Sequence, residues 1–491
     1  MKKPHLIYLF ADQLRADATP LYGPCGVQLP NLERLRSEGT VLTQAISTCP
    51  ICVPYRAMLL TGRHPQSTGH FGNFITTRHD EISIGDAFAR AGYRTGWVGK
   101  WHLHAGRATG GDRDEPEDIP AGRDRLGFDY FRAYNYHTQY ENGWLCGGPG
   151  GPERWRGYET EGLWRYAHEF LTTPGEHPFC LFISPHQPHL TKHGTFAPDD
   201  CFARLPAEIP IPAHTPGVPA AHVRAMWRNY WAMVVAIDDL LGKLLDVLDE
   251  RGLSDDTLLV FGSDHGTMGG ARGLDPWCKK LPYEESIRVP LAARWPGRLA
   301  AGQTCDALIA PVDLFPTLAG LCGVPTPGGL EGLDGSAAWQ GRSGGPGQEE
   351  VLTMNFIGHP DLPLPAGHPQ YRPHYEPWRG VRTARYSYVR WLSDREALFD
   401  LEEDPGQMRN LIAEPNAAPV RDRLRTRLAE LLARRGDAFP PSEAYADWLD
   451  AQRRVVRNAF GSLPPPEQPP DWTRFVPASM DGKCENPDKC C

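Results

Sequence analysis

The sequence predicts an α/β protein with a central, mostly parallel sheet flanked by helices. Two observations carry this prediction. Short apolar runs that end in polar residues alternate along the chain with segments of helical periodicity. The composition, with 41% hydrophobic and 23% charged residues among 491, is that of a globular protein long enough for more than one domain.

Four apolar runs are the candidate strands of the sheet. They are "HLIYLF" (5–10), "YRTGWVGKWHLH" (93–104), "PFCLFISPHQPH" (178–189) and "TLLVFGSDHG" (257–266). Continuous apolar runs suit strands that are buried on both faces. In each run the polar residues come last, and open α/β sheets bind ligands outside the carboxyl ends of their strands. A functional site is therefore expected at that edge of the sheet.

The helices expected between these strands are "NLERLRSEG" (31–39), "SIGDAFARAG" (83–92) and the long segment 222–252. In the long segment the apolar residues recur at helical spacing, and Gly252 ends the helix. A further helix is expected to begin near Cys52, with Pro54 in its first turn, where the missing N–H costs little.

The chain divides into a predicted catalytic α/β domain, 1–377, and a smaller C-terminal domain, 378–491. Segments 105–160 and 341–377 lack periodicity and are expected to be loop insertions that wall a substrate cleft. The second domain is expected to be α+β, with a short antiparallel sheet and then a charged amphipathic helix; the segments are 380–392, 396–412 and 420–436. The tail "DGKCENPDKCC" is expected to be flexible, and its cysteine spacing fits no standard zinc pattern.

Charge and cysteine content exclude some function classes. A net charge of −9 argues against nonspecific nucleic-acid binding. No run approaches the roughly 18 apolar residues of a membrane span, and the apolar run before Asp12 is too short for a signal peptide. The twelve cysteines do not resemble a secreted disulfide framework. A cytoplasmic protein with mostly free thiols is expected; the C-terminal arm leaves a homo-oligomer open.

Polar residues after the first and last candidate strands form a possible metal site. Asp12 and Gln13 follow one strand, and Asp264 and His265 follow the other. Carboxylate, amide and imidazole ligands suit a hard divalent cation such as Ca²⁺, with Mn²⁺ or Mg²⁺ as alternatives. Either pair taken alone would more often be a structural turn.

The stretch "CVPYR" adds a candidate nucleophile, Cys52. Arg56 lies one helical turn later and can share its face, while the free amides at a helix start favour an anion. This arrangement suits attack on a charged oxyanion ester. The alternative from another class is a thiol-redox protein that uses Cys49 and Cys52. That motif is expected in a much smaller thioredoxin-like domain, and it leaves the metal set unexplained.

The string "CPICVPYRAMLLTGRHP" (49–65) resembles the signature of the type I, formylglycine-dependent sulfatases of the alkaline phosphatase superfamily, C-x-P-x-R followed by a leucine-rich helix and T-G. Further pieces follow in family order: "ADQLRAD", "GYRTGWVGKWHL", "SPHQPH", "VFGSDHG", "KKLPYEESIRVPL" and "LFDLEEDP". The resemblance runs from residue 5 to about residue 412. It implies an alkaline-phosphatase-like sandwich and hydrolysis of a sulfate ester.

The resemblance also implies roles for individual residues. Cys52 would be converted to formylglycine by a formylglycine-generating enzyme, and its hydrate would be the nucleophile. The implied metal ligands are Asp12, Gln13, Cys52, Asp264 and His265. The other implied catalytic residues are Arg56, which orients the formylglycine; Lys100, at the sulfate; His102, at the formylglycine hydroxyl; and His189 and Lys279, at the leaving group, with Lys280 as an alternative to Lys279.

Two departures from the commonest family pattern stand in this sequence. Tyr55 occupies the position where serine is most frequent, which bears on maturation, and Gln13 replaces a second aspartate. The nearest rival is a phosphonate monoester or phosphodiester hydrolase of the same superfamily; that branch departs at "GKWH", whereas Lys100 and His102 are both present. A non-catalytic member of the fold is a further alternative. The loop composition suits a small-molecule or saccharide sulfate ester.

Overall fold

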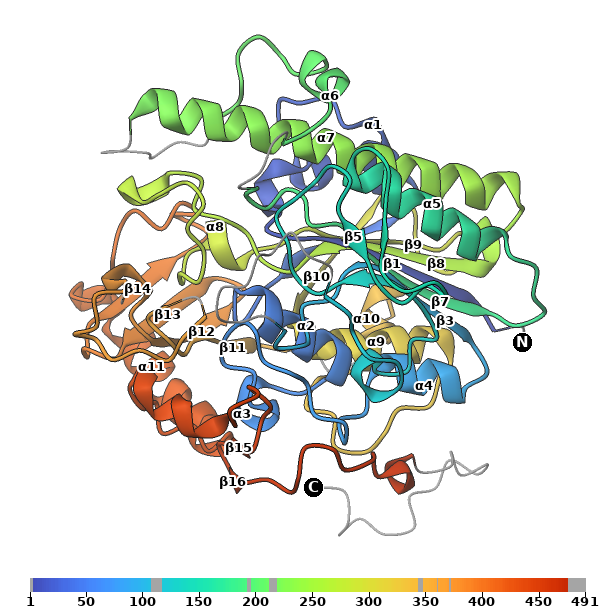
Figure 1. Ribbon diagram of the computed structural model, residues 1–491. Helices are drawn as coiled ribbons and strands as arrows, with labels where there is room; N and C mark the ends of the chain where they lie inside the picture. Colours follow the sequence, from blue (N-terminus) through green and yellow to red (C-terminus); the bar gives the residue numbers. More distant parts are fainter. Residues whose placement is uncertain are drawn as a thin grey trace.

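The computed structural model describes residues 3–106, 117–191, 196–211, 219–342, 348–359, 361–370 and 372–475. Its centre is an eight-stranded sheet (Figure 1). In spatial order the strands are β10 (Gln303–Ile309), β2 (Thr40–Ala45), β9 (Leu291–Arg294), β8 (Thr257–Ser263), β1 (His5–Ala11), β7 (Phe179–Ser184), β3 (Arg94–Lys100) and β4 (Tyr130–Tyr134). Strand β9 is antiparallel to both neighbours, and the other pairings are parallel. The predicted fold class is confirmed.

Strand β1 lies at the middle of the sheet and is buried on both faces. Alternate side chains of a strand point to opposite faces. Leu6, Tyr8 and Phe10 accordingly enter one hydrophobic core, and Ile7, Leu9 and Ala11 enter the other. Strand β1 pairs with β8 from His5↔Thr257 to Ala11↔Ser263, so the residues that follow the two strands emerge side by side.

Helices cover both faces of the sheet (Figure 1). One layer holds α7 (Ala220–Glu250), which contacts α1 (Pro30–Glu38), α5 (Glu159–Thr172) and α6 (Asp199–Ala203). The other holds α9 (Pro311–Cys322), which contacts α2 (Cys52–Thr61), α4 (Ile84–Arg90) and α10 (Ser336–Trp339). Two four-residue helices, α3 (Pro65–Thr68) and α8 (Glu284–Ile287), lie in connections. The four helices expected in this part of the chain are present, and the Ser83 side chain caps α4 as part of a capping box.

A second sheet lies in the C-terminal part and is antiparallel throughout: β11 (Glu350–Asn355), β12 (Trp378–Thr383), β13 (Tyr386–Trp391) and β14 (Glu396–Asp400). Helix α11 (Ala418–Arg434) contacts β12 and β13. The first strand of this sheet, β11, lies in segment 341–377, where only loop was expected. It forms because the short apolar run "VLTM" pairs with β12.

The other expected insertion, 105–160, also contains strands. It supplies β4 to the edge of the main sheet and the short pair β5 (Trp144–Leu145) and β6 (Glu153–Arg154). A last short pair is β15 (Arg457–Asn458) and β16 (Gly461–Ser462). The division at residue 378 stays a prediction, and the cysteine-containing tail lies outside the described residues. Within the described ranges, no helix is both long enough and apolar enough to cross a membrane.

Candidate active site

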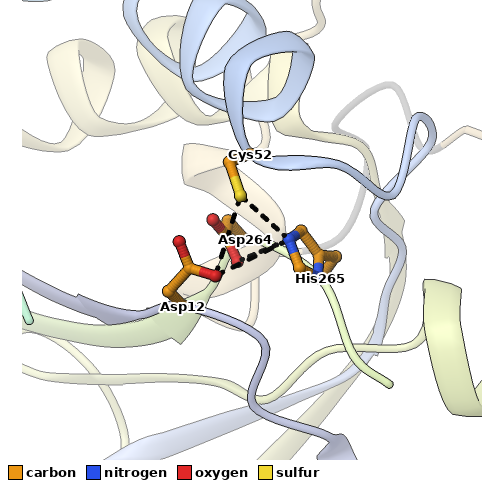
Figure 2. Close-up of side chains that lie close together, drawn as sticks. All are labelled: Asp12, Cys52, Asp264 and His265. Carbon is orange, nitrogen blue, oxygen red and sulfur yellow. Dashed lines mark hydrogen bonds and ion pairs between the residues drawn. The ribbon is translucent and has the colours of Figure 1, made fainter. Parts of the chain in front are cut away.

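Four side chains from three separate segments meet at the carboxyl edge of the main sheet (Figure 2). Asp12 follows β1, Asp264 and His265 follow β8, and Cys52 opens α2. Their potential ligand atoms all lie within 4.8 Å of one another, and all four residues are buried. Cys52 Sγ is 3.3 Å from His265 Nε2 and 3.7 Å from Asp12 Oδ1. The structure thus brings the ends of the two strands and Cys52 together.

Gln13 completes the oxygen-rich side of this cluster. Its backbone adopts φ 71°, which is uncommon for a residue with a side chain, and its N–H donates to Asp264 Oδ1 at 3.0 Å. The side-chain amide donates from Nε2 to Thr267 Oγ1 and to the Trp277 carbonyl, at 2.9 and 3.1 Å. These two bonds fix the amide orientation and leave Oε1 on the side of the site, 3.3 Å from Lys279 Nζ.

The donor set fits a hard divalent cation. His265 Nδ1 lies 3.0 Å from the Gly266 carbonyl, which assigns the ring hydrogen to Nδ1 and leaves the Nε2 lone pair facing the cluster. Asp264 Oδ2 is buried without a hydrogen-bond partner in the described part of the chain. A carboxylate oxygen without a hydrogen bond, beside a second carboxylate, an amide oxygen and an imidazole lone pair, is the environment that a bound cation would complete.

Burial and neighbouring charge set the protonation of the carboxylates. Burial alone would raise the pKa of Asp12, but electrostatic interactions with Lys100 above all, and also with His189 and Lys279, hold it well below its usual value. Burial and the negative charge of Asp12 raise the pKa of Asp264 above its usual value. Two carboxylates this close repel each other, so a cation between them would relieve the repulsion.

Helix α2 presents Cys52 and Arg56 to the same site. Arg56 is fully buried; its Nη2 lies 3.4 Å from Asp12 Oδ2 and 3.5 Å from Asp264 Oδ2, and its Nη1 donates to the Lys100 carbonyl at 2.7 Å. Burial and Asp12 raise the pKa of the Cys52 thiol to about 11. The helix therefore places one fixed positive charge behind the candidate nucleophile.

Tyr55, the unusual residue of the signature, faces away from this chemistry. It is 2% exposed and joins the hydrophobic core next to Phe10. Its hydroxyl lies 3.1 Å from that of Tyr8. The residue therefore acts in packing between α2 and the central strand.

Lys100, at the end of β3, is the cation closest to Asp12, with Nζ 2.5 Å from Oδ2. It is also 3.5 Å from Cys52 Sγ and 3.0 Å from His186 Nε2. His186 was given no role from the sequence, although it stands in the quoted string "SPHQPH". Its contact with Lys100 adds it to the site.

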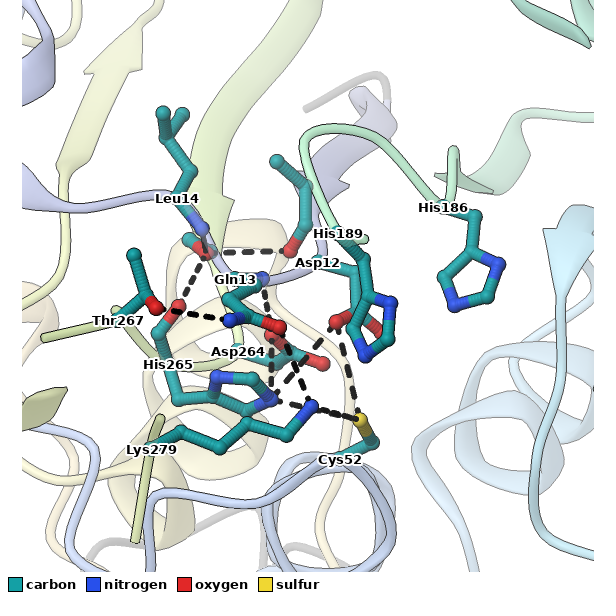
Figure 3. A network of polar contacts seen from close by, with 12 residues as sticks. Asp12, Gln13, Leu14, Cys52, His186, His189, Asp264, His265, Thr267 and Lys279 are labelled. Carbon is teal, nitrogen blue, oxygen red and sulfur yellow. Dashed lines mark hydrogen bonds and ion pairs between the residues drawn. The ribbon is translucent and has the colours of Figure 1, made fainter. Parts of the chain in front are cut away.

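His186 and His189 lie on the loop after β7, close to Asp12 and Cys52 (Figure 3). Their rings stack with centroids 4.7 Å apart. The buried carboxylate of Glu159 holds this loop: it accepts from the His186 N–H at 3.0 Å, from Gln187 Nε2 at 3.3 Å and from the Tyr134 hydroxyl at 2.5 Å. Glu159 has no sequence pattern that would have marked it.

His102 lies within the same buried region but makes different contacts from those expected. It has φ 59°, and its ring lies 5.0 Å from that of Phe74 and 4.9 Å from that of Tyr136. Neither ring nitrogen has a hydrogen-bond partner among the described residues, and burial holds its pKa well below the usual value. The expected contact with the nucleophile stays a prediction.

The two adjacent lysines separate clearly. Lys279 Nζ lies 3.7 Å from Cys52 Sγ, whereas Lys280 Nζ donates to the Ile357 and His359 carbonyls at 2.8 and 2.9 Å. Lys279 is therefore the lysine at the site. Cys49 and Cys52 are both free thiols, and Cys49 is part of a hydrophobic core.

Exposure is uneven among the described residues of the site. Asp12, Lys100, Asp264 and His265 are fully buried, while Lys279 and His189 are partly exposed. A substrate can therefore approach from the side of these two residues. That is the side on which the sequence expected the leaving group.

Comparisons with known proteins agree with this geometry. The family model described as Sulfatase matches residues 4–324, and the one described as N-sulphoglucosamine sulphohydrolase, C-terminal, matches residues 274–434. The ulvan-active sulfatase of Formosa agariphila is 32% identical over 454 residues, covering 90% of this chain and 84% of that protein.

Two solved structures share the fold. One, in complex with its substrate D-glucosamine-2-N,6-O-disulfate, has a TM-score of 0.75 at 22% identity and covers 90% of this chain and 100% of its own. The other, a phosphonate monoester hydrolase from Silicibacter pomeroyi, has a TM-score of 0.68 at 22% identity and covers 89% of this chain and 96% of its own. The fold alone therefore does not separate the two reactions.

Proposed function

This chain belongs to the sulfatase family, an enzyme family that hydrolyses sulfate esters, and from that premise we propose that it cleaves a saccharide sulfate ester at Cys52, with one divalent cation bound beside it. The observation that carries this is the buried cluster of Asp12, Cys52, Asp264 and His265, with Lys100 and Lys279 against the same sulfur atom. The saccharide class is supported by the name of the Formosa relative and by the sugar disulfate bound in a solved neighbour.

The proposed cation ligands are Asp12, Gln13, Asp264 and His265, together with the modified residue 52. Three of these four side chains offer oxygen, which favours Ca²⁺ over softer metals, with Mn²⁺ and Mg²⁺ as alternatives. When bound, the cation would draw negative charge from a sulfuryl oxygen and help the nucleophile ionise.

We propose that Cys52 is converted to formylglycine, which would supply an oxygen nucleophile that can release sulfate again after the transfer. The intact C-x-P-x-R motif supports this, and a formylglycine-generating enzyme is the implied maturation partner. Because the Tyr55 side chain packs in the core, we expect a substitution at this position to change the stability of the protein more than the chemistry at residue 52.

The protein's own residues supply charge and protons around the sulfate. Lys100 holds Asp12 ionised, and Arg56 and Lys100 offset the negative charge of the ester. On the open side, Lys279 adds a third positive charge. His189 Nδ1 lies 2.9 Å from the Leu190 carbonyl, which leaves Nε2 as the atom that can carry a proton to the departing alkoxide.

The test measures sulfate release by protein made in a host that contains a formylglycine-generating enzyme. A monosulfated sugar and para-nitrophenyl sulfate are compared with a phenyl phosphonate monoester, and Cys52→Ala is the control. We expect sulfate esters to have the higher kcat/KM and the variant to be inactive. A higher kcat/KM for the phosphonate would assign the chain to phosphonate monoester hydrolysis, the reaction named for the structural neighbour from Silicibacter pomeroyi.

We also propose a cytoplasmic location. Nine cysteines in the described part of the chain are free thiols, which suits a reducing compartment. Cell fractionation of the native host, with an antibody against the chain, checks this; recovery from the periplasm or the medium would contradict it.

A further inference from the structure

A second lysine next to the site holds a loop rather than the nucleophile. The ammonium of Lys280 is buried and donates to the carbonyls of Ile357 and His359. Its backbone has φ 69°, a conformation that is strained for a residue with a side chain. The strained backbone directs Lys279 and Lys280 to different places, the first to Cys52 and the second to this loop. The loop is therefore tied to the site by an unusual local structure.

An arginine from the C-terminal part ties the same loop to a second segment beside the site. Arg453, with φ 56°, donates to the backbone carbonyls of Phe74 at 2.6 Å and of Asn73 and Asp361 at 2.9 Å each. The Gly358 N–H donates to the Ser442 hydroxyl at 3.1 Å. Residues far apart in sequence thus fix the position of Asp361. Support of this kind is typical of side chains that recognise a ligand.

The carboxylate of Asp361 lies two hydrogen bonds from the amide that follows Cys52. Asn73 Oδ1 accepts from the Val53 N–H at 3.3 Å, and Asn73 Nδ2 donates to Asp361 Oδ1 at 3.3 Å. Asp361 is also one of the negative charges that raise the pKa of Lys279, against the opposing effect of burial. The carboxylate is partly exposed. It therefore lies on the open side of the site, near the leaving-group lysine.

The positive charges of Lys279, Lys280 and Arg453 lie near enough to interact with the charge of Asp361, but in the described ranges none of them donates a hydrogen bond to its carboxylate. Within the described ranges the carboxylate accepts its hydrogen bond from the neutral amide of Asn73, whereas Arg453 donates to the backbone carbonyl of Asp361. A carboxylate beside a site for anionic esters weakens the binding of any anion by repulsion. A carboxylate in this position can accept a hydrogen bond from the substrate, and such bonds to a charged acceptor are strong.

We propose that Asp361 is a specificity-determining residue that accepts a hydrogen bond from a hydroxyl or N–H group of the leaving group next to the sulfate ester. The inference rests on the proposed function. It narrows the substrate class to sugar sulfates with a free donor beside the ester. A carboxylate or second sulfate at that position is disfavoured, because it would face a like charge in a half-buried space.

The test compares the full-length wild type with Asp361→Asn and the exposed control Asp394→Asn. The substrates are monosulfated hexoses with the ester at each ring position, the matching sugars that lack the hydroxyl next to the ester, and para-nitrophenyl sulfate, which has no such hydroxyl. Asp361→Asn should lower kcat/KM by about 10- to 100-fold on the best hexose sulfate, the loss expected for a hydrogen bond to a charged group. On para-nitrophenyl sulfate and the deoxy sugar the change should stay within about threefold. The Asp394 variant should match the wild type.

Equal losses on the sugar and aryl sulfates would overturn the inference, since they would indicate a general structural role. So would an unchanged rate on the best hexose sulfate. If Asp361→Asn does not fold, the wild type alone decides: the deoxy sugar should show the same 10- to 100-fold loss, roughly, against its parent. A wild type that cleaves no sulfate ester would instead overturn the proposed function, and the inference with it.

Discussion

The buried carboxyl of Glu159 makes the stability of this protein depend on pH in a defined window. Burial is the main cause that raises its pKa from 4.5 to about 7, against the opposing effect of its hydrogen bonds to Tyr134, His186 and Gln187. Well below pH 4.5 the group is protonated in both the folded and the unfolded chain. Well above pH 7 it is ionised in both, and the folded protein then carries a buried charge. Stability is therefore lost as the pH rises through this window.

Replacing Glu159 with glutamine removes this titration. At about 1.4 kcal/mol per pKa unit, the raised pKa corresponds to about 3 kcal/mol over the whole window. An experiment from about pH 5 to about pH 8.5 misses the part of the titration below pH 5. Over this range the free energy of unfolding of the wild type should fall by about 2.5 kcal/mol relative to Glu159→Gln.

Urea unfolding followed by tryptophan fluorescence at several pH values measures this difference. The matched control is Glu161→Gln on the same helix, because Glu161 is 49% exposed and pairs with Lys243 at the surface. This control removes a surface carboxylate from the same helix and leaves the buried contacts of Glu159 in place. A constant difference for Glu159→Gln across the range, or one that grows in favour of the wild type at high pH, would refute the reasoning.

Three further changes probe the site. Lys100→Met leaves Asp12 without its nearest cation, so kcat on a sugar sulfate should fall by about 100- to 1,000-fold. A cooperative thermal unfolding transition shows that the variant is folded. A loss of kcat under about tenfold would contradict the role of Lys100. A chelator should abolish sulfate release. Ca²⁺ added back at about 100 times its dissociation constant should restore activity and raise the free energy of unfolding by about 2.7 kcal/mol. Full activity in the presence of the chelator would exclude a role for the cation. Tyr55→Ser empties a core position and should lower the free energy of unfolding by about 3–5 kcal/mol. Tyr55→Phe leaves Tyr8 without its hydroxyl partner and should lower it by about 1 kcal/mol. Urea unfolding measures both, and a serine variant as stable as the wild type would contradict the packing role.

Much of the sheet and the cluster of possible metal ligands could be predicted because both follow from local patterns. The apolar runs of β1 and β8 indicate buried parallel strands, and the polar residues directly after them must then emerge at one edge. That reasoning needs no knowledge of the rest of the fold. It placed Asp12 and Asp264 together, and they are indeed neighbours in the structure.

The supporting residues could not be predicted because their roles depend on distant partners. Glu159 begins α5, yet what it holds is the loop at His186, which is brought to it by the packing of α5 on the sheet. Asn73, Asp361 and Arg453 are far apart in the sequence and come together only in the folded chain. Strand β9 has four residues, and a pattern this short does not predict that the strand lies antiparallel between β2 and β8.

Mass spectrometry of the peptide that carries Cys52 tests the central claim most directly. The protein is made in a host with an active formylglycine-generating enzyme, digested under conditions that preserve aldehydes, and compared with the same protein from a host without that enzyme. The account predicts that residue 52 has lost its sulfur and carries an aldehyde in the first preparation and remains a thiol in the second. An unmodified thiol in both preparations, or a disulfide between Cys49 and Cys52, would contradict it.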